Sequence, residues 1–188
     1  LIVNNYGGVI KNYMPVYIGS GASSAVALLS QGGSIENYAD IQNNSGNGTS
    51  IYVRGSFLNE GNIEVNGENG KAIVVESGSL TSENDYITVN GKSAISIYGA
   101  SSTFETPSLN IKTDKMELTG EKSAAIFSNG ANVSLGSKTA GQNMKMEVSG
   151  NESVGFYNKI NYKKYGKLTL TSDIDVDIKD GAYGFYHV

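Results

Sequence analysis

The five residues Ile87-Thr88-Val89-Asn90-Gly91 hold the pattern on which the fold depends. Apolar and polar side chains alternate in them, as in a half-buried strand, and the stretch ends on glycine. This apolar-x-apolar-x-Gly pattern occurs five times, as Ile63-Glu64-Val65-Asn66-Gly67, Ile87-Thr88-Val89-Asn90-Gly91, Met116-Glu117-Leu118-Thr119-Gly120, Met146-Glu147-Val148-Ser149-Gly150 and, with one extra residue, Val176-Asp177-Ile178-Lys179-Asp180-Gly181. The copies begin 24, 29, 30 and 30 residues apart.

Two further elements recur with the same spacing. A strand follows each glycine, as in Lys92-Ser93-Ala94-Ile95, Lys122-Ser123-Ala124-Ala125, Glu152-Ser153-Val154-Gly155-Phe156-Tyr157 and Gly184-Phe185-Tyr186. A Gly-x-apolar element, often followed by Asn, occurs as Gly8-Val9-Ile10-Lys11-Asn12, Gly33-Ser34-Ile35-Glu36-Asn37, Gly55-Ser56-Phe57-Leu58-Asn59, Gly78-Ser79-Leu80 and Gly166-Lys167-Leu168. Asn12, Asn37 and Asn59 are therefore predicted to form an amide ladder at one corner.

A fixed period of this length indicates a solenoid or a propeller. Three strands per repeat are too few for a propeller blade, and the leucine pattern of a leucine-rich repeat is missing. The sequence therefore predicts an all-β, right-handed parallel β-helix with about seven three-stranded rungs of 22–31 residues, each strand pairing with its copy in the next rung. The predicted buried column consists of Ile63, Ile87, Met116, Met146 and Val176. We expect residues 1–188 to form a single segment, less regular over 1–46 and clearly repeated over 47–188.

Composition excludes several classes of function. The chain has no Cys, so it can form neither a disulfide framework nor a Cys-based zinc site. Its net charge of -4 gives no basic footprint for nucleic acid, and no cofactor motif of the phosphate-binding type is present. The chain has a single histidine, His187, and no Gly-x-Ser-x-Gly motif that would hold a nucleophilic serine for it to activate. Because the chain begins at Leu1 without a signal peptide and ends within a strand pattern, we expect a fragment of a longer protein.

The Gly-Asn turns, the Ile-x-Val-x-Gly strands and the Ser-Ala-Ile or Val-Gly-Phe-Tyr strands together resemble the passenger region of large Gram-negative autotransporter adhesins. The bias toward Lys, Asn, Ile and Ser is similar to that of the fusobacterial type. The resemblance covers most of the chain, best over residues 47–188. It implies an extracellular position at the cell surface or outer membrane, with any membrane anchor outside this fragment. It also implies binding to host or bacterial cell-surface glycans or proteins.

The last rungs carry acidic side chains that the alternation places on the outside. An outward column is predicted to contain Glu64, Thr88, Glu117, Glu147 and Asp177, beside Lys115 and Lys145, which could offset the repulsion between carboxylates. In the last rung no lysine separates Asp173, Asp175 and Asp177. The first interpretation is a solvated face without a metal. A weak calcium site is the second, because calcium prefers carboxylate oxygens.

The segment 157–167 interleaves tyrosine with lysine between two predicted strands. Connecting loops elsewhere in this chain use Gly, Asn and Ser, so three tyrosines here call for another explanation. Tyrosine supplies a broad apolar face with a polar tip, which suits recognition, and lysine would attract an acidic partner such as a sialylated glycan. The candidate ligand-binding residues are Tyr157, Lys159, Tyr162, Lys163, Lys164 and Tyr165. A solvated corner loop is the alternative.

Three functions remain open from the sequence. The chain can be a non-catalytic adhesin segment that presents a binding surface. It can be a polysaccharide-active enzyme, a lyase or a glycosidase, on the same fold, which would need two carboxylates facing each other in a cleft. It can also be a structural stalk that has no ligand of its own.

Overall fold

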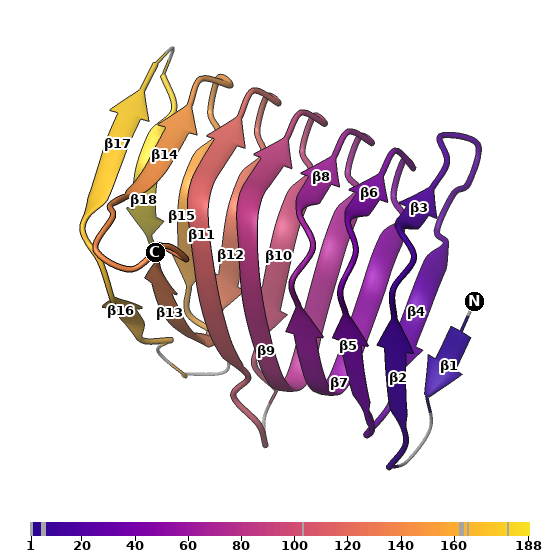
Figure 1. The fold of residues 1–188 in the computed structure, drawn as a ribbon. Helices are drawn as coiled ribbons and strands as arrows, with labels where there is room; N and C mark the ends of the chain where they lie inside the picture. The colour runs from indigo at the N-terminus through magenta and orange to yellow at the C-terminus, as the bar shows by residue number, and fades with distance from the viewer. Residues whose placement is uncertain (1, 5–6, 103, 162–163, 165, 180) are drawn as a thin grey trace.

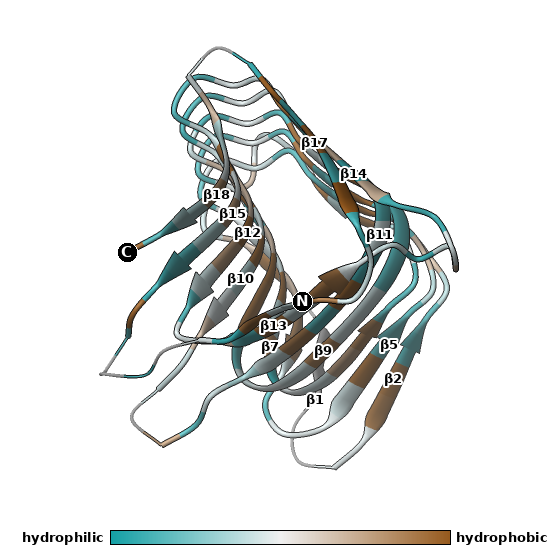
Figure 2. Ribbon diagram, turned by 90° about the vertical axis from the view of Figure 1, so that its left-hand side faces the viewer, coloured by the Kyte–Doolittle hydropathy of each residue, from teal (hydrophilic) through white to brown (hydrophobic). Residues whose placement is uncertain are grey.

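The computed structural model describes residues 2–4, 7–102, 104–161, 164, 166–179 and 181–188. Over these residues every regular element is a strand, and the strands stack side by side into one coil (Figure 1). All the pairings between named strands are parallel, which confirms the predicted β-solenoid. Figure 2, turned by 90° from Figure 1, shows the turns one behind another around a single interior.

The coil has three walls, which the chain visits in the order A, B, C. Wall A contains β2 (Val9–Asn12), β5 (Ser34–Asn37), β13 (Asn132–Gly136) and β16 (Leu168–Leu170). Wall B contains β3 (Val16–Ile18), β6 (Ile41–Asn43), β8 (Ile63–Val65), β14 (Met144–Val148) and β17 (Ile174–Ile178). Wall C contains β1 (Ile2–Asn4), β4 (Val26–Ser30), β10 (Ile95–Ala100), β12 (Ala124–Asn129), β15 (Val154–Lys159) and β18 (Tyr183–His187).

Three longer strands continue around corners and belong to more than one wall. β7 (Thr49–Asn59) passes from wall C to wall A, and β11 (Ser108–Leu118) passes from wall A to wall B. β9 (Lys71–Val89) contributes to all three walls. Counted on wall A from β2 to β16, the chain makes seven turns, here called turns one to seven.

Each wall carries inward-facing apolar side chains that stack turn on turn, and wall B has a second such column that includes Val65, Val89, Leu118 and Val148. On wall B the first column is Val16, Ile41, Ile63, Ile87, Met116, Met146 and Val176. The predicted column is therefore confirmed, and its members are buried except Val176, which is 40% exposed in the last turn. The column on wall A is Ile10, Ile35, Phe57, Leu80, Leu109, Val133 and Leu168. The column on wall C is Leu28, Ile51, Ile73, Ile97, Ile126, Phe156 and Phe185.

Two details of the predicted register are wrong. Ile95 pairs with Ala124 and not with Ala125, because the turn from β10 to β12 takes 29 residues while the repeated Lys-Ser-Ala letters are 30 apart. A shift of one residue would turn every side chain of the strand to the opposite face. On wall A, Val133 and Leu168 are partners 35 residues apart, which exceeds the expected 22–31 because a long connection lies between them.

The glycine that closes the wall B motif is required by the close approach of successive turns in every copy but the last, where Gly181 instead has a left-handed φ of 74°. A Cβ added to Gly120 would overlap the carbonyl oxygen of Gly91, and one on Gly150 would overlap the carbonyl oxygen of Gly120. The backbone φ angles of Gly120 and Gly150 do not lie in the left-handed region. That conformation falls a few residues later in the same corner, at Ser24, Asn47, Asn69, Ser93, Lys122 and Glu152.

The predicted amide ladder is present at the corner between walls A and B. The Nδ2 of Asn12 donates to the Oδ1 of Asn37 at 2.6 Å, and the Nδ2 of Asn37 donates to the Oδ1 of Asn59 at 2.7 Å. Each amide also donates to the backbone carbonyl two residues further on. Asn37 and Asn59 are fully buried, so these bonds satisfy polar groups that would otherwise be costly to bury.

The glycine column gives a stability test with a matched control. We expect Gly120→Ala to lower the free energy of unfolding by about 2 kcal/mol or more, because its Cβ meets only backbone atoms that cannot move aside. Gly21→Ala is the control, since nothing lies within 4 Å of its added Cβ, and it should change stability by less than about 0.5 kcal/mol. Urea unfolding followed by circular dichroism measures both. Equal stabilities for the two variants would contradict the close stacking at this corner.

Candidate binding site

The corner between walls C and A is uneven along the coil. Turns two and three cross it within the continuous strands β7 and β9, at Arg54 and at Glu76–Ser77. Turns four and six cross it with longer connections, at 101–107 and 160–167. Because the short crossings show that the coil can close without extra residues, the two long connections need an explanation other than the fold.

Half of the predicted ligand-binding residues lie at this corner within the described structure. Tyr157 and Lys159 belong to β15, where Tyr157 is half-buried and Lys159 is exposed. Lys164 is half-buried and its backbone N–H donates to the carbonyl of Asn161 at 2.8 Å. Tyr162, Lys163 and Tyr165 lie outside the described residues. The assignment of these six residues to a ligand therefore stays a prediction.

Tyr157 belongs to an aromatic column on the outer face of wall C. Its ring stacks on Phe127 with the centroids 4.5 Å apart and on Tyr186 with the centroids 5.4 Å apart, and Phe127 contacts Tyr98 at 5.3 Å. In a stacked column the face of each ring packs against the ring of the next turn, so these contacts stabilise the stacking of successive turns. The sequence carried the signal, since an aromatic residue follows an inward apolar one in Ile97-Tyr98, Ile126-Phe127, Phe156-Tyr157 and Phe185-Tyr186, yet sequence reasoning missed it.

A groove lies between the connection 101–107 and the short crossings of turns two and three. We call it the corner groove; it has a volume of about 630 Å³. Its lining includes Arg54, Glu76, Tyr98, Phe104, Asn129 and Asn161. Asn161 reaches it from the second long connection, where its Nδ2 donates to the carbonyl of Ser101 at 2.6 Å. The groove thus joins residues from turns two to six.

Among the described aromatic residues at this corner Phe104 is the most exposed, with 92% of its surface accessible. The connection that carries it is held by Ser102, whose Oγ accepts the backbone N–H groups of Phe104 at 3.3 Å and Glu105 at 3.0 Å. The backbone N–H of Ser102 also donates to the carbonyl of Glu105 at 2.9 Å. An apolar ring is therefore presented to solvent on a locally ordered turn.

The floor of the corner groove carries an ion pair between neighbouring turns. Arg54 donates from Nε and Nη2 to the same carboxylate oxygen of Glu76, at 2.9 and 2.7 Å. Burial opposes ionisation of Glu76, but hydrogen bonds from Tyr52 and Arg54 outweigh it and lower the pKa of that carboxyl. Glu76 is therefore a carboxylate at neutral pH, and the Tyr52 ring lies under the guanidinium at 5.6 Å.

The predicted acidic column on wall B is confirmed, with Glu64, Thr88, Glu117, Glu147 and Asp177 in register. Lys115 offsets it as expected, because its Nζ lies 3.1 Å from Glu117 and 3.0 Å from Glu147. Hydrogen bonds to Glu147 and Glu117 raise the pKa of Lys115.

The three aspartates of the last turn are all exposed. Asp175 accepts a hydrogen bond from Asn143 at 3.2 Å, and Asp177 pairs with Lys179 at 3.2 Å. In the part of the chain that the structure describes, no group of three or more Asp, Glu, His or Cys is arranged to hold a metal ion. The calcium interpretation of Asp173, Asp175 and Asp177 remains untested.

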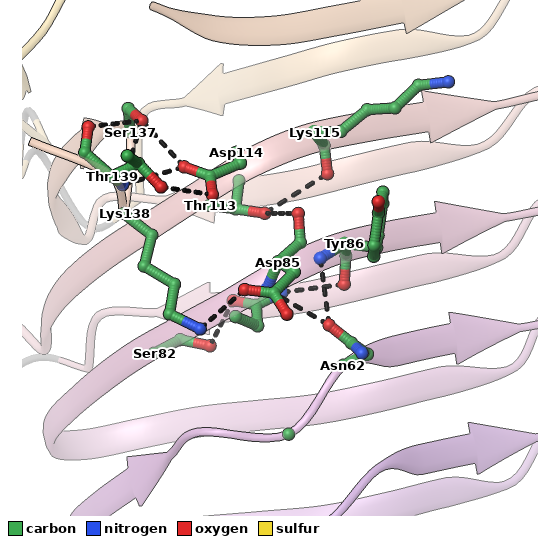
Figure 3. Close-up of polar contacts among 12 residues, drawn as sticks. Asn62, Ser82, Asp85, Tyr86, Thr113, Asp114, Lys115, Ser137, Lys138 and Thr139 are labelled. Atoms are coloured by element: carbon green, nitrogen blue, oxygen red, sulfur yellow. Dashed lines mark hydrogen bonds and ion pairs between the residues drawn. The ribbon is translucent and has the colours of Figure 1, made fainter. Parts of the chain in front are cut away.

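A second polar cluster ties three turns together at the corner between walls A and B (Figure 3). The connection 137–143 leaves β13 and folds back over the preceding turns. Asp114 accepts hydrogen bonds from the Ser137 and Thr139 hydroxyls and from the Thr139 backbone, at 2.7–2.8 Å. Lys138 reaches one turn further and pairs with Asp85 at 2.6 Å. These contacts form a clamp between three successive turns, in which both Asp114 and Asp85 already have partners from the chain itself.

Comparison with known protein families, with curated proteins and with solved structures gave no match for this chain. Within the described residues no helix is long and apolar enough to cross a membrane. The fold and the site together define the chain as a parallel β-solenoid with a groove at one corner that aromatic, charged and amide side chains line.

The clamp predicts a specific dependence of stability on pH. Burial opposes ionisation of Asp114, but hydrogen bonds from Thr139, Ser137 and the backbone outweigh it and lower the pKa of Asp114 below its ordinary 3.8. The stabilisation is therefore complete above that ordinary value and is lost as the pH falls through the lowered pKa. We expect Asp114→Asn to reduce the melting temperature by a few degrees (about 2–4 °C per kcal/mol) at neutral pH and by less in acid.

Melting curves of the parent and Asp114→Asn between pH 2 and 7 measure this difference. Glu105→Gln is the control, because Glu105 is exposed on a connection outside the clamp. A difference between parent and Asp114→Asn that stays constant over the whole pH range would contradict the role given to this carboxylate.

Proposed function

We propose that this chain is a non-catalytic segment of a cell-surface adhesin. Its β-solenoid is the scaffold, and the corner between walls C and A is the surface that binds host or bacterial cell-surface glycans or proteins. The localisation at the cell surface or outer membrane belongs to the same proposal, since it rests on the resemblance to autotransporter passengers.

One observation carries the proposal: two connections at this corner are longer than the coil requires, and they border a groove with aromatic and polar side chains, the first along 101–105 and the second through Asn161. Binding residues are commonly held on loops that a rigid scaffold positions. A groove of about 630 Å³ lies within the range of small-ligand sites.

The alternatives have less support. A glycosidase needs two carboxylates that face each other across a cleft. The carboxylates of wall B stand on an outward sheet face and share Lys115. Glu76 and Glu105 both line the corner groove, but Glu76 is already paired with Arg54. A stalk without a ligand explains the aromatic column and the clamp, because both join successive turns. It gives no reason for the fully exposed ring of Phe104.

Attachment of the purified chain to host and bacterial cells tests the proposal. We expect saturable binding, and a variant in which residues 100–107 are replaced by Glu-Ser-Gly, the crossing of turn three at 76–78, should bind at least tenfold more weakly. Its unfolding transition should stay cooperative, since turn three closes with the same three residues, including the glycine with a left-handed φ. Tyr86→Ser is the control, because Tyr86 is an exposed tyrosine on wall B, away from the corner.

Absence of attachment by the parent chain to any cell type would make the adhesin proposal wrong and leave the stalk. Attachment that the shortened variant retains at full strength would place the binding surface elsewhere on the coil.

A further inference from the structure

We propose that the corner groove binds a neutral oligosaccharide, with Phe104 as the stacking platform and the Arg54–Glu76 pair as the group that orients the sugar hydroxyls. This inference rests on the proposed binding function and names its ligand class. It involves residues that lie outside the lysine-rich connection predicted from the sequence.

The apolar part of the argument is the availability of a ring face. In the aromatic column the faces of Phe127, Tyr157 and their neighbours are covered by one another. Phe104 is 92% exposed, and among the described residues its ring contacts no other aromatic ring. Binding sites use aromatic rings of this kind because they offer a large apolar area at low entropic cost. The C–H face of a pyranose is the complement of such a ring.

The polar part is a mixture of fixed donors and acceptors beside that ring. Arg54 donates two hydrogen bonds to one oxygen of Glu76, and Tyr52 also donates to this carboxylate. Two carboxylate oxygens offer about four acceptor positions, so this carboxylate can still accept from a sugar hydroxyl. Asn129 donates from Nδ2 to the Tyr98 hydroxyl at 3.2 Å, and its amide oxygen can accept a hydrogen bond from a ligand. Adjacent sugar hydroxyls donate and accept at once, and they match a set that contains guanidinium, carboxylate and amide groups.

Charge selects a neutral ligand over an acidic one. The described lining of the groove holds one cation, Arg54, and two carboxylates, Glu76 and Glu105. Arg54 is already paired with Glu76, so a sialic acid carboxylate would meet a net negative groove without a free cation. The sialylated glycan expected from Lys163 and Lys164 is therefore not the ligand that this groove favours.

An array of neutral and sialylated oligosaccharides with the same cores tests the inference, followed by calorimetry with the best neutral compound. We expect neutral glycans to bind, with an affinity that changes less than twofold between 50 and 500 mM salt, because no ion pair forms with the ligand. Phe104→Ser and Arg54→Gln should each weaken binding at least tenfold. Lys112→Gln is the matched control, since Lys112 forms a similar exposed pair with Glu83 between neighbouring turns.

Three outcomes would overturn the glycan inference alone. The first is binding of sialylated glycans only, or binding that weakens steeply with salt. The second is neutral binding that Phe104→Ser and Arg54→Gln leave unchanged while both variants melt like the parent. The third is attachment to cells without binding to any neutral glycan, which would overturn the glycan inference and leave the proposed adhesin function standing. If the parent chain neither attaches to cells nor binds any glycan, both the adhesin proposal and the glycan inference are wrong.

Discussion

Each turn of this coil must lie within backbone hydrogen-bonding distance of the next, about 4.8 Å, and the other features of the structure follow from that spacing. Identical positions of successive turns are then in direct contact, so each wall stacks like side chains on like. Apolar positions form the buried columns of the three walls. At the tightest point only glycine fits, because a Cβ on Gly120 or Gly150 would overlap the carbonyl of the turn before it. Repeat proteins of this kind gain most of their stability from such nearest-neighbour contacts.

The same spacing turns polar groups into ladders. Asn12, Asn37 and Asn59 bond to one another only because each sits directly over the last. The ladder changes column in turn four, where Asn59 donates to Ser82 and Ser82 donates to Asn84. The corner from wall A to wall B is one residue longer in turn four: Ile63 follows Asn59 by four residues, whereas Ile87 follows Ser82 by five. The amide of turn four is therefore supplied by Asn84, the next inward-facing residue after Ser82. Ion pairs such as Lys115 with Glu147 and Lys112 with Glu83 repeat this arrangement on the outside.

The repeat made the walls, the wall B column and the Asn ladder predictable, because side chains that recur at one spacing must stack. The register around Ile95 was not predictable from the Lys-Ser-Ala letters, since the backbone spacing between glycines, 29 residues there, decides the pairing. The corner groove and the clamp were also beyond the sequence. Arg54, Glu76 and Phe104 come from different turns, and Lys138 meets Asp85 across 53 residues, so no local pattern joins them. Tyr157 was predicted to bind a ligand, which stays a prediction, and the aromatic column of which it is part was missed.

In this account the stacked walls supply the stability of the coil, and the longer corner connections supply the binding surface. Native-state hydrogen exchange is the most direct measurement of where the stability lies. If stacking between neighbouring turns holds the coil together, amide protection is greatest in the wall strands of the middle turns, β8, β9 and β11 (Ile63–Val65, Lys71–Val89 and Ser108–Leu118). It then falls stepwise toward β2 and β18, and the described amides of the connection 101–107 exchange faster than those of the wall strands beside it. Equal protection of end and middle turns, or fast exchange throughout the wall strands, would contradict the account.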